Sequence, residues 1–90
     1  MTATSLATSH TTYLTAAFYK FVELSNFPEM KEPLLAFCES QGVKGTILLA
    51  NEGINSTIAG PESGVRAVLA YLKNDPRLAT LEHKESWSSK

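Results

Sequence analysis

The second half of the chain repeats its apolar residues with the spacing of one face of an α-helix. The residues at the i, i+3, i+4 and i+7 positions are Val65, Val68, Leu69 and Leu72. Pro61 suits the first position of such a helix, because the N–H that proline lacks has no partner there in any case. The Asp-Pro pair at residues 75–76 predicts its end. A helix with a single apolar face must be covered by another layer of structure, which the rest of the chain has to supply.

A second apolar stripe at helical spacing precedes it. The stripe consists of Met30, Leu34, Phe37 and Cys38. Gly42 follows, and glycine is typical of the C′ position that ends a helix. Pro33 lies within the stripe, where it would remove one backbone hydrogen bond at a cost of ~3 kcal/mol. We therefore expect the helix proper to start near Glu32, with Pro33 in its first turn, or a loose turn to precede it.

Four stretches have the composition of β-strands. Residues 13–24 are rich in aromatic and β-branched side chains on both faces, which favours a central strand. Residues 43–50 and 54–59 flank the turn at residues 51–53 (Asn-Glu-Gly), whose final glycine suits the positive φ of a hairpin. Residues 81–87 alternate weakly and read as the last strand.

The resulting order, β-α-β-β-α-β, predicts an α+β fold of the ferredoxin-like kind. Both helices would cover one face of an antiparallel four-stranded sheet, and the other face would be open or covered by a partner. We expect residues 1–12 to form a flexible tail, residues 13–87 to form this single domain, and residues 88–90 to fray.

The bulk composition excludes several classes of protein. Ninety residues suffice for one domain. The net charge of −1 argues against strong autonomous binding of nucleic acid, because dedicated binders are basic. The chain has no apolar run of the ~20 residues that a membrane helix needs, and its first residues do not have the pattern of a signal peptide. A lone cysteine fits a reducing compartment, so we expect a cytoplasmic protein.

The chemically reactive residues do not form a recognisable catalytic or metal site. Cys38 lies on an apolar helix stripe without a neighbouring cation, which predicts core packing rather than a reactive thiol. His10 and His83 are far apart and lack a cysteine cluster, so no metal site is expected, and His83 reads as a strand surface residue. Glu82 and Glu85 would point to opposite faces of the last strand and could not converge on a substrate.

Two functional families share the predicted fold. Acylphosphatases need an arginine in the loop after the first strand, whereas residues 25–28 here are Ser-Asn-Phe-Pro; Asn55, near the position of a catalytic asparagine, does not suffice alone. RNA recognition motifs stack bases on sheet aromatics. The predicted strand at residues 54–59 has none and the family's signature is absent, although Tyr19 or Phe21 could serve.

The strand lysines that could share an open sheet face and contact phosphate are Lys20, Lys44 and Lys84.

Three segments together resemble the N-terminal domain of the rhodanese-related tRNA uridine hydroxylases, a bacterial family. They are residues 19–22 (YKFV), 44–60 (KGTILLANEGINSTIAG) and 81–86 (LEHKES). The resemblance spans residues 17–87 and implies an acylphosphatase-like form of the fold, within a protein that uses oxygen to hydroxylate the wobble uridine of certain tRNAs. The resemblance also implies that the catalytic cysteine belongs to a following rhodanese domain, which we expect this chain to lack. Cys38 matches the helix of the N-terminal domain instead, so the catalytic role is not carried over to it.

The resemblance leads us to expect an excised accessory domain, not an enzyme by itself and without a cofactor, that helps to position tRNA and packs on the rhodanese domain. Candidate contacts with tRNA or with that domain are Lys44, Glu52, Asn55, His83 and Lys84. Two alternatives stay open. One is a structural docking module without RNA contact, in which a partner buries Tyr19 or Phe18. The other is a phosphate-binding domain of the acylphosphatase type.

Overall fold

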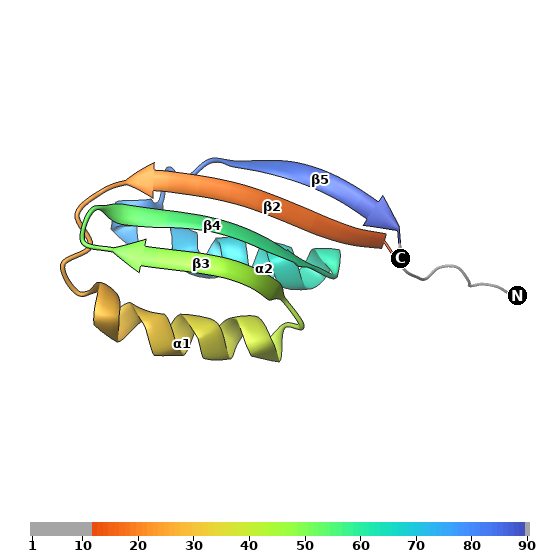
Figure 1. The fold of residues 1–90 in the computed structure, drawn as a ribbon, viewed down its shortest axis with the longest axis horizontal. Helices are drawn as coiled ribbons and strands as arrows, with labels where there is room; N and C mark the ends of the chain where they lie inside the picture. The colour runs from red at the N-terminus through yellow and green to blue at the C-terminus, as the bar shows by residue number, and fades with distance from the viewer. Residues whose placement is uncertain (1–11, 90) are drawn as a thin grey trace, which may run out of the picture.

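The computed structural model describes residues 12–89 and contains one sheet and two long helices (Figure 1). The elements in chain order are β2 (Thr12–Phe21), α1 (Phe27–Ser40), β3 (Lys44–Ala50), β4 (Gly53–Gly60), α2 (Glu62–Lys73), the 3-10 helix η1 (Pro76–Leu78) and β5 (His83–Ser89). The predicted tail lies outside the described residues except for Thr12, which begins β2. No helix among residues 12–89 has the length and apolar character to cross a membrane.

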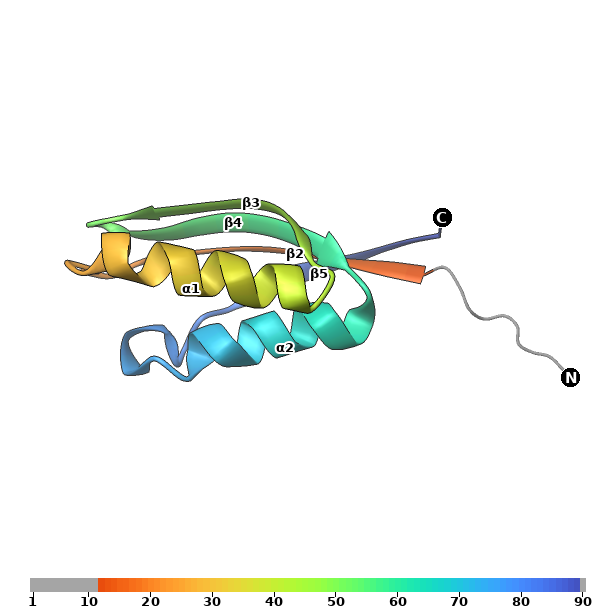
Figure 2. The same ribbon diagram turned by 90° about the horizontal axis from the view of Figure 1, so that it is seen from below.

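The four strands pair antiparallel in the order β3-β4-β2-β5, so β2 is central as predicted. Both helices lie on the same face of this sheet, and no described segment covers the other face (Figure 2). This arrangement confirms the ferredoxin-like α+β fold.

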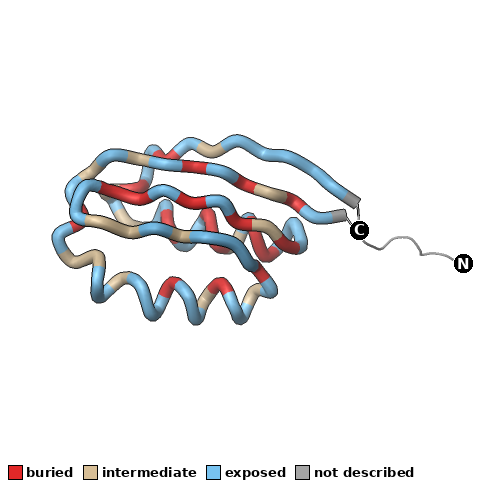
Figure 3. The backbone as a smooth tube through the Cα atoms, viewed as in Figure 1, coloured by how far each residue is buried: buried red, intermediate tan, exposed pale blue. Residues whose placement is uncertain are grey.

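The core lies between the sheet and the helices (Figure 3). The apolar stripe of α2 is buried along its whole length, and Leu34 and Cys38 are the buried residues of α1. From the sheet, Leu14, Ala16 and Phe18 point into the same layer. Both predicted helix faces are therefore confirmed, and alternate residues of the strands supply the opposing wall.

The start of α1 corrects the sequence prediction. The helix begins at Phe27, with Pro28 in its first turn, and Pro33 is inside it rather than at its start. The physical reason is packing, because Phe27 and Met30 contact the core from the first turn. Partial burial of these two large side chains offsets the one backbone hydrogen bond that Pro33 removes.

Several element ends also differ from the prediction. Pro61 is the N-cap of α2 rather than its first helical residue, because its ψ of 145° is extended. β2 ends at Phe21, and the next residues bond instead to the β3–β4 turn, where Val22 N–H donates to the Glu52 carbonyl at 2.9 Å. The last strand, β5, runs over residues 83–89 instead of the predicted 81–87, so Ser88, expected to fray, belongs to it and pairs with Tyr13.

Two glycines shape the β3–β4 hairpin. Gly53 has a φ of 146° at the end of the turn, as predicted. Gly45 has a φ of 137° within β3, and a Cβ atom there would collide with the carbonyl oxygen of Thr57 on β4. A Cβ atom at Gly53 would likewise collide with the carbonyl oxygen of Lys20 on β2. A side chain at either glycine is therefore excluded both by the backbone conformation and by the approach of a neighbouring strand.

Candidate functional site

The uncovered side of the sheet, which we call the open face, consists of the strand positions that alternate with the buried ones. They are Tyr13, Thr15, Ala17, Tyr19 and Phe21 of β2, Lys44, Thr46, Leu48 and Ala50 of β3, Gly53, Asn55, Thr57 and Ala59 of β4, and Lys84, Ser86 and Ser88 of β5. Several of its apolar side chains are strongly solvent-exposed, namely Tyr19 (67%), Phe21 (83%) and Leu48 (60%). Such a cluster of exposed apolar side chains is typical of a binding surface.

The charged residues of the open face are all positive. Lys44 lies on the β3 edge and Lys84 on the β5 edge, and no carboxylate occupies an open-face strand position. Three strand spacings separate the two edges, or ~14 Å. Lys20 does not join them, because it pairs with the buried Ile54 and so points to the helix side. Of the three strand lysines considered from the sequence, two can therefore act together.

The strand register brings aromatic, amide and basic groups into adjacent rows. Tyr19 pairs with Asn55, while Lys84 pairs with Ala17 one row away. A hollow of about 610 Å³ lies among them, lined also by Thr57 and Glu82, and we call it the Tyr19 hollow. Its volume falls within the range of small-molecule sites.

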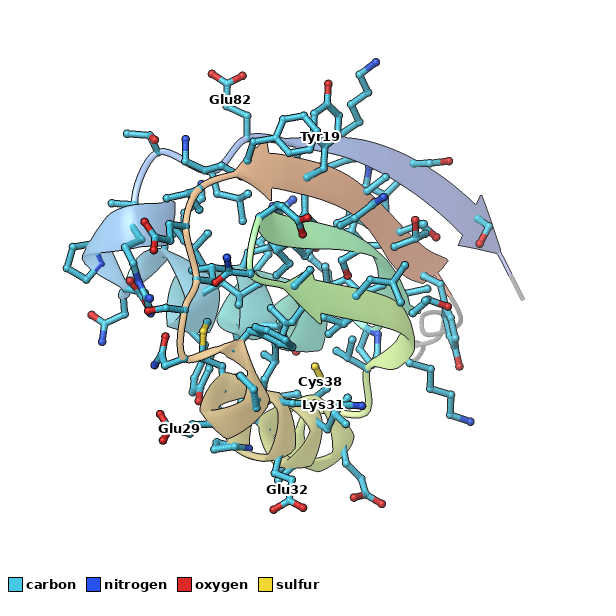
Figure 4. The ribbon with its side chains drawn as sticks, turned by 60° about the vertical axis from the view of Figure 1, so that its left-hand side comes forward. Tyr19, Glu29, Lys31, Glu32, Cys38 and Glu82 are labelled. Carbon is cyan, nitrogen blue, oxygen red and sulfur yellow. The ribbon has the colours of Figure 1, made fainter. Side chains whose placement is uncertain are left out.

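A smaller, more apolar hollow adjoins it toward the hairpin. This hollow of about 180 Å³ is lined by Tyr19, Phe21, Leu48 and the turn residue Glu52, and we call it the Phe21 hollow. Figure 4 shows Tyr19 and Glu82 projecting on the side of the sheet away from α1. Carboxylates therefore border the face at the end where β2 finishes, although none lies within it.

His83 occupies the other side of β5 from Lys84. It pairs with the buried Phe18, and its Nε2 lies 2.7 Å from Oε2 of Glu85. Glu85 in turn accepts two hydrogen bonds from Arg66, which also bonds Glu62. The Arg66 guanidinium, assisted by His83, lowers the pKa of Glu85 to about 2. The histidine is thus part of an ion-pair cluster that joins β5 to α2.

The five candidate residues therefore separate into three groups. Lys44, Asn55 and Lys84 share the open face, Glu52 lies in the turn at its end, and His83 lies on the helix side. The two glutamates do not converge, as predicted, since Glu85 faces α2 while Glu82 lines the Tyr19 hollow, but Glu82 precedes β5 instead of belonging to it.

Burial determines what two further residues can do. The Cys38 side chain lies in the core, and desolvation raises the pKa of its thiol, so the reactive thiolate is disfavoured as predicted. Phe18, named as a partner contact in the docking alternative, is 3% exposed and packs under the helices. Among the two aromatic residues named there, Tyr19 alone is available to a partner.

Arg77 has a role that sequence reasoning missed. Its guanidinium bonds the Asp75 carboxylate at 2.7 Å and Oδ1 of Asn26 at 2.8 Å, which ties the start of α1 to the end of α2. The neighbouring Asp75, whose side chain caps η1, was the only local signal. With these partners, Arg77 does not substitute for the phosphate-holding arginine that an acylphosphatase loop requires.

Comparisons with known proteins agree with this geometry. The family model described as UPF0176 acylphosphatase-like domain matches residues 13–90. The chain is 71% identical over 80 residues to a tRNA uridine(34) hydroxylase of Albidiferax ferrireducens, covering 89% of this chain and 25% of that protein. It is 58% identical over 78 residues to the protein of the same name from Acaryochloris marina, and 56% over 78 residues to that from Rhizobium etli, each time covering 87% of this chain and 25% of the relative. The chain thus spans about a quarter of the length of the curated relatives it matches.

Proposed function

This chain belongs to the family of UPF0176 acylphosphatase-like domains, and on that basis we propose that it is the accessory domain of a tRNA uridine(34) hydroxylase. In this role it helps to position tRNA and packs on the rhodanese domain, while the oxygen-dependent hydroxylation of the wobble uridine takes place elsewhere in the full protein.

The observation that carries the tRNA part is the placement of Lys44 and Lys84. They lie on the two edges of an otherwise uncharged open face, with exposed polar side chains between them. Lysines at such positions contact phosphates and orient a nucleic acid without reading its sequence. With a net charge of −1, the domain would add to the affinity of a larger protein rather than bind tRNA tightly alone.

The packing part rests on the Phe21 hollow. Phe21 and Leu48 are among the most exposed apolar side chains of the described residues. They lie on β2 and β3, on either side of β4, at the hairpin end of the open face, where Glu52 borders the same hollow. A rhodanese domain that covered this end would remove apolar surface from water.

The surroundings of the reactive groups support the proposal of a non-catalytic role for the domain. The thiol of Cys38 is in the core, and Arg77 is engaged by Asp75 and Asn26. Asn55 lies on the open face without an arginine beside it, so the pair of groups that would hold an acyl phosphate is not assembled among the described residues.

The test is a chimera in which residues 13–90 replace the matching quarter of the Albidiferax ferrireducens protein. We expect the chimera to hydroxylate uridine 34. The double variant Lys44→Glu/Lys84→Glu should bind tRNA more weakly and lose roughly 1.4–1.8 from the slope of log affinity against log salt, the value for two phosphate contacts. The matched control is Lys31→Glu, because Lys31 is exposed on α1, which packs on the opposite face of the sheet from the open face (Figures 2 and 4). Unchanged tRNA affinity in the double variant would refute the positioning role.

A further inference from the structure

We infer that the Tyr19 hollow binds one unpaired nucleotide of an RNA, with its base stacked on Tyr19, its edge bonded by Asn55 and its phosphate held by Lys84. This inference deepens the proposed function and rests on it for the identity of the RNA. It assigns the three groups to one site because strand register places them in neighbouring rows.

Tyr19 provides a fixed stacking surface. It lies on the central strand, which is paired on both sides by β4 and β5, yet its side chain is 67% exposed. The ring of Phe21 is 5.8 Å away and inclined by 52°, so the two rings do not stack face to face. An exposed aromatic face on a rigid strand is the surface on which single-stranded nucleic acid stacks, whatever the base.

Asn55 and Lys84 supply polar groups that are free to bind. Among the side-chain hydrogen bonds between described residues, none involves either of them. The Asn55 amide offers both donors and an acceptor, which suits the edge of a base. The Lys84 ammonium offers a positive charge to a phosphate.

The charges around the hollow favour RNA over an apolar protein segment. Lys84 of β5 and Glu82, which comes just before that strand, line the same hollow. The carboxylate accepts hydrogen bonds from base N–H or ribose hydroxyl groups and repels phosphate, which directs the phosphate toward Lys84. A purely apolar partner would leave both charged groups and Asn55 without partners, at a cost in desolvation.

The test compares two RNA probes on the 90-residue chain. One is an anticodon stem–loop with an unmodified uridine at position 34, and the other is a fully paired RNA duplex with the same number of phosphates. Binding is measured at low salt by fluorescence anisotropy. We expect tighter binding of the stem–loop, because its loop bases are free to stack whereas those of the duplex are not.

Variants then separate stacking from charge. Tyr19→Ala should weaken stem–loop binding by about 5- to 100-fold, and Tyr19→Phe should retain it, since removal of one stacking residue has effects of this size. Tyr13→Ala is the matched control, because Tyr13 is exposed on the same face of the same strand, six residues or ~20 Å away. Lys84→Ala should reduce the salt slope by roughly 0.7, and Lys31→Ala should not. Circular dichroism confirms that each exposed-residue variant is folded.

Three results would overturn the site. They are equal affinity for stem–loop and duplex, equal effects of Tyr19→Ala and Tyr13→Ala, and loss of affinity in Tyr19→Phe. If the Tyr19→Ala chimera binds RNA normally but its N-terminal domain no longer packs on the rest of the protein, the hollow is assigned to a protein partner. If the chimera hydroxylates uridine 34 while Tyr19→Ala binds the stem–loop normally, the proposed function holds and this inference fails. If the chimera is inactive while stem–loop binding depends on Tyr19, the nucleotide site holds and the proposed function fails.

Discussion

Tyr19 of β2 and Asn55 of β4 lie directly opposite each other in the sheet, on the face that neither helix covers. The pairing joins an aromatic ring to an amide across two adjacent strands, and both side chains are exposed. Because the strands are held by backbone pairing, the relative position of these groups is set by the fold rather than by a mobile loop.

A negative charge at Asn55 should disfavour RNA without disturbing the fold. We expect Asn55→Asp in the chimera to lower tRNA affinity, since the new carboxylate faces the phosphates across the open face. Its melting temperature should stay unchanged because the side chain is exposed. Ser63→Asp makes the same charge change on the exposed surface of α2 and serves as the control. Equal losses of tRNA affinity in the two variants would show that net charge, and not the open face, governs binding.

Gly45 should be far less replaceable than Gly42. A Cβ atom at Gly42 would lie 3.9 Å from the Pro61 ring, which is an ordinary contact. Gly42→Ala therefore has only the backbone strain of a φ of 71°, which costs about 1–2 kcal/mol. Gly45→Ala adds a collision with the β4 backbone to a φ of 137°, and we expect it to lower the free energy of unfolding by about 2–4 kcal/mol. Urea unfolding of the two variants measures the difference. Equal destabilisation would contradict the close approach of β3 to β4.

The ion pair of Glu85 should make stability depend on acid pH. The folded state lowers the pKa of Glu85 from 4.5 to about 2, chiefly through the Arg66 hydrogen bonds. Its stabilising effect is therefore complete above pH 4.5, decreases as the pH falls toward 2, and is absent below that pH. Glu85→Gln should melt at a lower temperature than the unmodified chain at pH 7, and the difference should disappear by pH 2.

The control for that experiment is Glu32→Gln, which removes a carboxylate that projects from α1 (Figure 4). We expect little difference in melting temperature for this variant at pH 7. A difference for Glu85→Gln that persists unchanged at pH 2 would show that the Arg66 pair is not its origin.

The elements that sequence reasoning predicted well are those defined by local patterns. The α2 stripe repeats within one short segment, and Gly53 marks the hairpin because a positive φ suits glycine. The predicted start of α1 was wrong because the local cost of Pro33 in a helix was considered without the packing of Phe27 and Met30 against the core. Contact with a core assembled from distant segments is not visible in a sequence window.

The candidate site was predictable in part for the same reason. Asn55 follows the alternation of β4 and lies on the opposite face from the buried Ile54 and Ile58. The directions of Lys20 and His83, in contrast, depend on strand register. His83 contacts Glu85, which accepts hydrogen bonds from Arg66 of α2. Arg66 and Glu85 are 19 residues apart in the sequence. Arg77 and Asn26 are 51 residues apart, so nothing local connects them.

An NMR titration of the isotope-labelled 90-residue chain with unmodified tRNA, at low and moderate salt, would show which face of the domain tRNA contacts. The account predicts salt-sensitive shifts at Lys44, Asn55, Lys84 and Tyr19 on the open face, with little change at Lys31 on α1, because phosphate contacts weaken steeply as salt rises. Shifts confined to the helix side, or none at either salt, would contradict a tRNA-contacting open face and leave the domain with docking alone.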